Sequence, residues 1–176
     1  MAQDKLPARR LRLFLRDFRM VEATIGLSEG QSLTQYFASR KQYVNLRAAK
    51  WASSSDVTKH AVLKIDQVLW AAALDNDIPL INAMAQNAPR EVEVQLDGGL
   101  LVRAGLNVGE GQRLIDYLES QPQFVPMRSA QLLRSGRPPK EVNVSLGDIV
   151  LNQVAVQAVW ELAAQKADAE TEMMAE

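Results

Sequence analysis

The sequence predicts a mainly β protein of the α+β class, in which two tandem β-β-α-β-β-β units form small barrels or curled antiparallel sheets and a C-terminal helix follows. The first observation is an internal repeat. Residues 11–70 align with residues 92–151 without a gap, and 14 of the 49 positions from 21 to 69 are identical, where average composition gives about 3 by chance. The second is alternation of apolar and polar residues at the start of each copy, and the third is a change to helical spacing in its middle.

Each copy opens with a predicted β-hairpin. Apolar residues alternate with other residues over 11–15 and 92–96, and this period of two is typical of a strand with one buried face. In the second copy the next residues are Asp97-Gly98-Gly99, a favourable tight turn because both glycines can adopt positive φ. The return strands are expected at 21–27 and 102–108, where the alternation resumes.

A short helix is predicted next in each copy, over residues 31–39 and 112–120. Leu33, Tyr36 and Phe37 have the i, i+3, i+4 spacing of one helix face, and the second copy repeats it. Three more strands are expected after the helix. The third lies at 43–46 and 124–127, the fourth at 61–65 and 142–146, and the fifth at 68–74 and 149–157, after turns at Asp66-Gln67 and Gly147-Asp148.

These elements divide the chain into four parts. The first repeat unit is predicted at 10–73, a linker at 74–90, the second unit at 91–158, and a C-terminal helix with an acidic tail at 159–176. A unit of about 60 residues buries only about 60% of its chain surface and is marginal alone. The two units are therefore expected to pack against each other or against further subunits.

Composition sets the broad class. The chain contains no cysteine, which excludes disulfides and thiolate chemistry and suits a reducing, cytoplasmic location. The longest apolar run, Val68–Leu74, is far shorter than the roughly 20 residues that span a bilayer, so no membrane span is predicted. Residues 1–80 hold 12 basic and 8 acidic residues, a net charge of +4, while residues 81–176 hold 8 and 13, a net charge of −5. This division reflects either drift after duplication or contact with partners, or between the copies, through opposite charge.

No catalytic, metal or cofactor site is predicted, so the protein is expected not to be an enzyme. His60 is the one histidine, and neither a phosphate-binding loop nor a dinucleotide motif occurs. Glu29 and Glu110 match between the copies and could act as paired carboxylates; the alternative is that each acid favours the N-terminus of a helix. Asp75-Asn76-Asp77 resembles part of a calcium loop but lacks its glycine and bidentate acid, and a surface turn is predicted.

Nucleic acid is the alternative partner. In the first copy basic and aromatic side chains interleave, as on a single-strand binding face, whereas the second copy carries mostly uncharged residues at the same places. The competing interpretation is a solvated strand with aromatic core residues. The candidate residues for a protein or nucleic-acid partner are Arg40, Lys41, Tyr43, Arg47, Lys50 and Trp51.

Two resemblances follow from these motifs. The strand Val92–Leu96, the helix Arg113-Leu114-Ile115-Asp116-Tyr117-Leu118 and the strand Phe124-Val125-Pro126-Met127 resemble a group of small uncharacterised bacterial β-rich domains with an Arg-Leu-x-Asp-x-Leu helix between strands. In the first copy Ser32 and Gln35 replace Arg113 and Asp116. The opening pattern is also similar to Sm-like barrels, which form rings and bind RNA, although the helix interrupts that pattern.

Together these features predict a non-enzymatic assembly or adaptor protein without a cofactor, which mediates protein–protein interactions. Its expected partners are other proteins or further copies of the same chain in a homo-oligomer. The alternative is a nucleic-acid-binding pair of small barrels.

Overall fold

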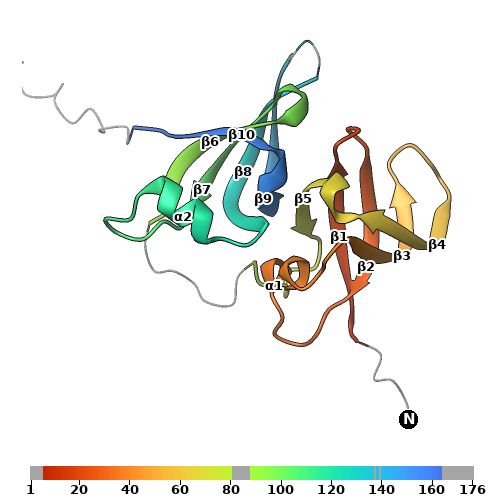
Figure 1. Cartoon of the computed structure of the whole chain (residues 1–176). Coiled ribbons are helices and arrows are strands. Elements are labelled where there is room, and N and C mark those ends of the chain that lie inside the picture. The colour runs from red at the N-terminus through yellow and green to blue at the C-terminus, as the bar shows by residue number, and fades with distance from the viewer. Residues whose placement is uncertain (1–5, 81–87, 137, 139, 164–176) are drawn as a thin grey trace, which may run out of the picture.

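The computed structural model describes residues 6–80, 88–136, 138 and 140–163. Its ten strands form one antiparallel sheet in the order β10-β6-β7-β8-β9-β5-β1-β2-β3-β4, which curls into two lobes (Figure 1). The first lobe contains β1 (Ala8–Leu15), β2 (Met20–Gly26), α1 (Leu33–Ala38), β3 (Tyr43–Trp51), β4 (Val57–Lys64), the 3₁₀ turn η1 (Ile65–Gln67) and β5 (Val68–Ala73). The second contains β6 (Arg90–Leu96), η2 (Asp97–Gly99), β7 (Leu100–Leu106), α2 (Leu114–Ser120), β8 (Phe124–Ser135), β9 (Lys140–Asn152), η3 (Gln153–Ala155) and β10 (Val156–Glu161).

The mainly β class is confirmed, and the strand order is the same within each lobe. The first lobe has the order β5-β1-β2-β3-β4 and the second β10-β6-β7-β8-β9. The registers correspond as well: Leu11 pairs with Ala23, and 81 residues later Val92 pairs with Ala104. Neither lobe closes into a barrel, because among the described strands β4 and β10 each have a neighbour on one side only. The described strands therefore form one antiparallel sheet that is not closed.

The gapless alignment of the two copies is wrong after the third strand. Tyr43 pairs with Lys64, 21 residues later, whereas Phe124 pairs with Asn152, 28 residues later. The β8–β9 hairpin is thus seven residues longer than the β3–β4 hairpin. Residues after the hairpins correspond at a spacing of 88, and η1 and η3 are related by this spacing.

This longer hairpin corrects two predicted elements. Residues 149–152 are the end of β9, and the fifth strand of the second lobe is β10 at Val156–Glu161; the helix predicted from residue 159 therefore does not begin there. The turn predicted at Gly147-Asp148 is instead an irregularity within β9, where Gly147 has a φ of +70°. The rest of the predicted C-terminal helix, 164–176, and linker residues 81–87 lie outside the described residues.

Helix α1 is short and is held at its N-terminus by a capping box. The Ser32 hydroxyl accepts a hydrogen bond from the Gln35 amide at 3.2 Å, and the Gln35 side chain accepts one from the Ser32 amide at 3.3 Å. A six-residue helix is not stable by itself. It depends on burial of Leu33, Tyr36 and Phe37 against the first lobe.

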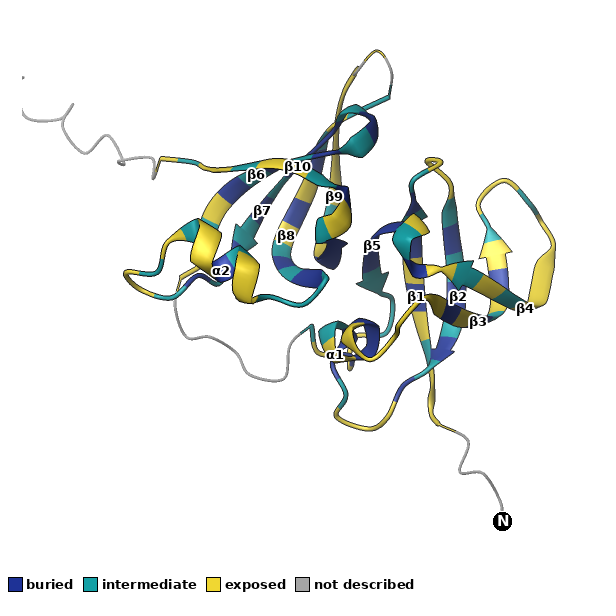
Figure 2. Ribbon diagram, in the orientation of Figure 1, coloured by how far each residue is buried: buried dark blue, intermediate teal, exposed yellow. Residues whose placement is uncertain are grey.

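The two lobes share their hydrophobic cores. Most of the first core comes from β1, β2, α1 and β3, but Phe124 and Val150 of the second lobe belong to it. Conversely, Leu69 and Trp70 of β5 belong to the second core. Figure 2 shows buried residues recurring along the strands of both lobes. Each lobe therefore needs side chains of the other to complete its core.

Each lobe bends its third strand at a β-bulge. Ala48 and, 81 residues later, Ser129 both have a φ of +48°, and each is the extra residue opposite the second strand of its lobe. An L-residue in this left-handed region costs roughly 1–2 kcal/mol. Because of the bulge, Arg47, which precedes Ala48, and Lys50, which follows it, point to the same outer face of the strand.

Replacing Ala48 with glycine is expected to raise the free energy of unfolding by about 1 kcal/mol, because relief of the left-handed strain exceeds the added backbone entropy. Ala48 is exposed, so no packing is lost. The matched control is Ala49→Gly at the next, fully buried position, which should lower stability. Urea denaturation measures both; a fall in stability for both variants would contradict the assignment of strain to Ala48.

Candidate interaction surfaces

The junction between the lobes joins the fourth strand of one lobe to the fifth strand of the other. β9 pairs with β5 through Trp70 opposite Leu151 and Ala71 opposite Val150. Beside this pairing, the Phe124 ring stacks on the Phe37 ring of α1, with centroids 4.4 Å apart. One face of β8 and β9 thus packs in the core of their own lobe, and the other face packs against the core of the first lobe.

Polar contacts complete the junction. The Asn152 side chain is fully buried, and its amide donates to the Val68 carbonyl at 2.9 Å. The Arg16 guanidinium forms an ion pair with Asp97 across the turns of the two lobes. Since the central contacts are apolar and the buried amide has a partner, this junction is built like a protein core.

The corresponding face of β3 and β4 in the first lobe is open. Tyr43 occupies the place of Phe124, and Val62 the place of Val150 at a spacing of 88. Phe124 and Val150 are fully buried, whereas Tyr43 is 55% and Val62 70% exposed. β4 is also the outer strand of the sheet, so its outer backbone edge has no strand beside it in the described chain. We call this surface, formed by Tyr43, Asn45, Val62 and Lys64, the β4 face.

At the opposite end of the sheet, β10 likewise has no strand on its outer side among the described residues. Leu114 and Leu118 of α2 and Val159 of β10 pack against the second core but are only partly buried. Their counterparts in the first lobe, Leu33, Phe37 and Ala71, are all buried. Phe124 of the second lobe stacks on Phe37, Val150 stands opposite Ala71, and the Leu33 amide donates to the Pro79 carbonyl. We call this surface, formed by Leu114, Leu118, Val159 and the outer edge of β10, the β10 face.

The two faces differ in charge. The β4 face includes the exposed Lys64, and exposed Lys41 lies in the turn two residues before Tyr43. Exposed Glu119 and Glu161 lie on α2 and β10, beside the β10 face. The Glu161 carboxylate lies 3.7 Å from the Arg90 guanidinium.

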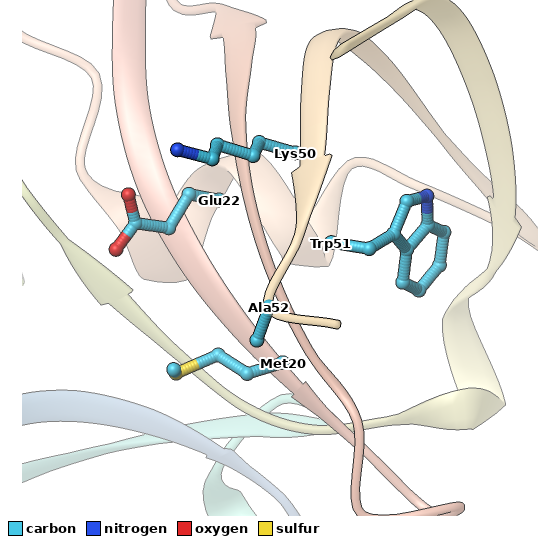
Figure 3. Close-up of a pocket in the computed structure, with 5 residues that line it drawn as sticks. All are labelled: Met20, Glu22, Lys50, Trp51 and Ala52. Carbon is cyan, nitrogen blue, oxygen red and sulfur yellow. The ribbon is translucent and has the colours of Figure 1, made fainter. Parts of the chain in front are cut away.

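The six residues predicted from sequence do not form one surface. Tyr43, Arg47 and Lys50 point outward, but Trp51 turns to the core side, and Figure 3 shows Trp51 directed away from Lys50. The Arg19 guanidinium lies 4.8 Å from the centroid of the Trp51 ring. One face of that ring is thus already covered.

A further member of the set, Arg40, has a partner within the first lobe. The Arg40 guanidinium lies 4.5 Å from the Tyr36 ring centroid, and burial raises the pKa of the Tyr36 hydroxyl while the nearby Arg40 opposes this shift. Lys50 stands opposite Glu22, and both side chains border a cavity of about 260 Å³ together with Met20 (Figure 3). Lys41 is exposed in the turn before β3.

The residues considered for catalysis do not converge. Glu29 and Glu110 are exposed in separate lobes, each before a glycine of positive φ. His60 is exposed on β4 opposite Arg47. Among the described residues no group of three or more histidine, aspartate or glutamate side chains is placed to hold a metal ion.

Asp75 and Asp77 tie the linker to β1. The Arg10 amide donates to Asp75 at 2.7 Å and its guanidinium at 3.0 Å, and Arg9 pairs with Asp77 at 3.0 Å. The backbone hydrogen bond from Arg10 is the main cause that lowers the pKa of Asp75 below its ordinary value of 3.8. The motif that resembled a calcium loop is thus occupied by arginines.

The lowered pKa of Asp75 predicts a pH dependence. A carboxyl whose pKa is lower in the folded state stabilises the fold above pH 3.8, and this stabilisation is lost as the pH falls through the folded pKa. Asp75→Asn is expected to cost about 1 kcal/mol at neutral pH and to flatten the fall in Tm below pH 3.8. Asp77→Asn, which removes only an exposed ion pair, should change Tm less. Equal acid-induced loss in Asp75→Asn and the unaltered chain would contradict this role.

Sequence reasoning missed Val62, the most exposed large apolar residue on the β4 face. At the 88-residue spacing Val62 and Leu63 match Val150 and Leu151 identically, so the signal was present in the sequence. No helix in the described part of the chain is long and apolar enough to cross a membrane. Comparison with protein-family models, curated proteins and solved structures finds no match for this chain.

Proposed function

We propose that this protein is a non-enzymatic assembly protein, built by duplication of a small β unit, that binds a protein partner through its β4 face. The observation that carries the proposal is the contrast in burial at equivalent places: Tyr43 and Val62 are exposed where Phe124 and Val150 are fully buried. Exposed apolar side chains beside an uncovered strand edge favour pairing with another chain.

The duplication is supported by the registers. Strand partners recur at a spacing of 81 up to the third strand and of 88 after the longer hairpin. Because the unit is duplicated, the chain contains two fourth strands, β4 and β9, and two fifth strands, β5 and β10. One of each is used in the junction between the lobes, and one of each is left at an end of the sheet. The absence of cysteine suits a cytoplasmic, reducing location.

The test is a pull-down with the full chain and two variants of β4. Val62→Asp places a carboxylate in the β4 face, while Val57→Asp makes the same change at a 59% exposed position at the other end of the strand. Partner proteins are expected on the unaltered chain and on Val57→Asp, but not on Val62→Asp, because burying an unpaired charge is costly. Equal retention by all three proteins, or none by any, would contradict the proposal.

Nucleic-acid binding is the second function that the sequence predicts, and the geometry supports it less. Trp51 faces the core and Lys50 stands beside Glu22, so the stacking and basic groups are not combined on one surface. Lys50→Glu provides the test by fluorescence anisotropy with a labelled single-stranded oligonucleotide. We expect no binding by the unaltered chain at physiological salt. Salt-dependent binding that Lys50→Glu abolishes would favour this second function instead.

A further inference from the structure

We infer that the partner of the β4 face is the β10 face of a second copy of this chain, so that copies associate head to tail. This inference rests on the proposed function and names the partner of the same site. It starts from the junction between the lobes, where a fourth strand, β9, already pairs with a fifth strand, β5. Among the described strands, the two outer strands of the same sheet are one fourth strand, β4, and one fifth strand, β10, and each is paired on its inner side only.

The registers define how the second copy would sit. Ala71 stands opposite Val150 within the chain. The equivalent of Ala71 in the second lobe is Val159, 88 residues later, and the equivalent of Val150 in the first lobe is Val62, 88 residues earlier. Val62 of one copy is therefore expected opposite Val159 of another. Tyr43 of the first copy then lies over Leu118, as Phe124 lies over Phe37 in the internal junction.

This arrangement would bury the apolar side chains that both ends leave exposed. Val62 and Tyr43 would complete the second core of the neighbouring copy, just as Val150 and Phe124 complete the first core. The position of Trp70 is held by Ala158, so less apolar surface is covered than inside the chain. The contact between copies should therefore be reversible, unlike the internal junction.

Charge favours this pairing over pairing of like ends. Because Tyr43 of one copy lies over Leu118 of the other, Lys41, two residues before Tyr43, would approach Glu119, the residue after Leu118. Two β4 faces would instead bring lysines together. Because the contact uses different surfaces on each copy, every added copy presents the same two open ends, and a ring or an open filament results.

Sedimentation velocity tests the association. The unaltered chain is expected to show species at multiples of 19.5 kDa that grow with concentration. Val62→Asp should weaken association by more than about tenfold, while Val57→Asp should associate like the unaltered chain. Circular dichroism checks that both variants remain folded, as their exposure implies. A monomer at every concentration, or equal association by Val62→Asp, would overturn the inference.

A disulfide experiment tests the register, since the chain has no cysteine of its own. Val62→Cys and Val159→Cys proteins are mixed and oxidised, and a mixed 62–159 disulfide is expected in clear excess over the 57–159 disulfide formed with Val57→Cys. A disulfide dimer of Val62→Cys alone, in equal or greater yield, would show pairing of two β4 faces and overturn the head-to-tail arrangement. If no disulfide forms and the chain is monomeric, but a different protein is retained only when Val62 is intact, the inference fails while the proposed function stands.

Discussion

Phe124→Ala is expected to lower the free energy of unfolding by about 3–5 kcal/mol, the usual cost of removing a buried aromatic side chain. Phe124 is fully buried in the core of the lobe to which its strand does not belong, and its ring stacks on Phe37 at 4.4 Å. The lost contact should therefore destabilise the first lobe as well as the second. Urea denaturation followed by circular dichroism measures the change.

The matched control is Tyr43→Ala, at the equivalent place in the first lobe. Tyr43 is 55% exposed, so in dilute monomeric protein the change should stay within about 1 kcal/mol. A similar loss for both variants would mean that the junction contributes no more than an exposed strand surface. Hydrogen exchange provides a further check. If Phe124→Ala lowered the protection of amides in the second lobe only, the result would contradict the sharing of cores.

Trp70→Ala is the reciprocal change, with an expected loss of about 3–5 kcal/mol. Trp70 lies on β5 of the first lobe but belongs to the core of the second, is 5% exposed, and stacks on Phe14 with centroids 4.2 Å apart. Its removal should open a cavity beside β5 and β9, the two strands that pair at the junction between the lobes. Thermal unfolding by circular dichroism, which does not depend on tryptophan emission, is the suitable measurement.

Trp160→Ala serves as its control. Trp160 is on β10, two residues beyond the equivalent of Trp70, and is 38% exposed; its indole donates to Glu93 at 3.0 Å. The expected loss is about 1 kcal/mol. Two transitions in Trp70→Ala, with the first lobe melting at its original temperature, would contradict the dependence of the lobes on each other.

Local patterns were sufficient to predict most of the elements. Alternation predicted the hairpins because one face of each strand is buried, and the spacing of Leu33, Tyr36 and Phe37 predicted α1, which buries these three side chains. The Asp97-Gly98-Gly99 turn was also predictable, since Gly98 and Gly99 have φ of +80° and +77°. Each of these features is decided by residues close in the sequence.

The fifth strand of the second lobe was not predicted because a gapless alignment cannot represent a longer hairpin. The β8–β9 ribbon takes up its extra residues in irregular pairings, among them the one at Gly147. A sequence signal for this existed. Positions 61–74 have no identical partner at the spacing of 81 but four at 88, namely Val62, Leu63, Val68 and Leu74.

The candidate site was predicted only in part, for two physical reasons. Grouping Lys50 with Trp51 ignored the period of two, which places neighbouring residues on opposite faces of a strand. Val62 lies within the predicted fourth strand at 61–65, but nothing local distinguishes a solvated valine from one at a contact surface. Its importance emerges from the burial of Val150, which depends on how the two lobes pack.

Hydrogen exchange of the unaltered chain in dilute and concentrated solution tests the claim that copies assemble head to tail through the ends of the sheet. Amides of β5 and β9 are expected to be protected at both concentrations, because they pair within the chain. Amides on the outer edges of β4 and β10 should gain protection together only in the concentrated sample. Equally fast exchange of β4 and β10 at both concentrations, or protection of β4 without β10, would contradict the claim.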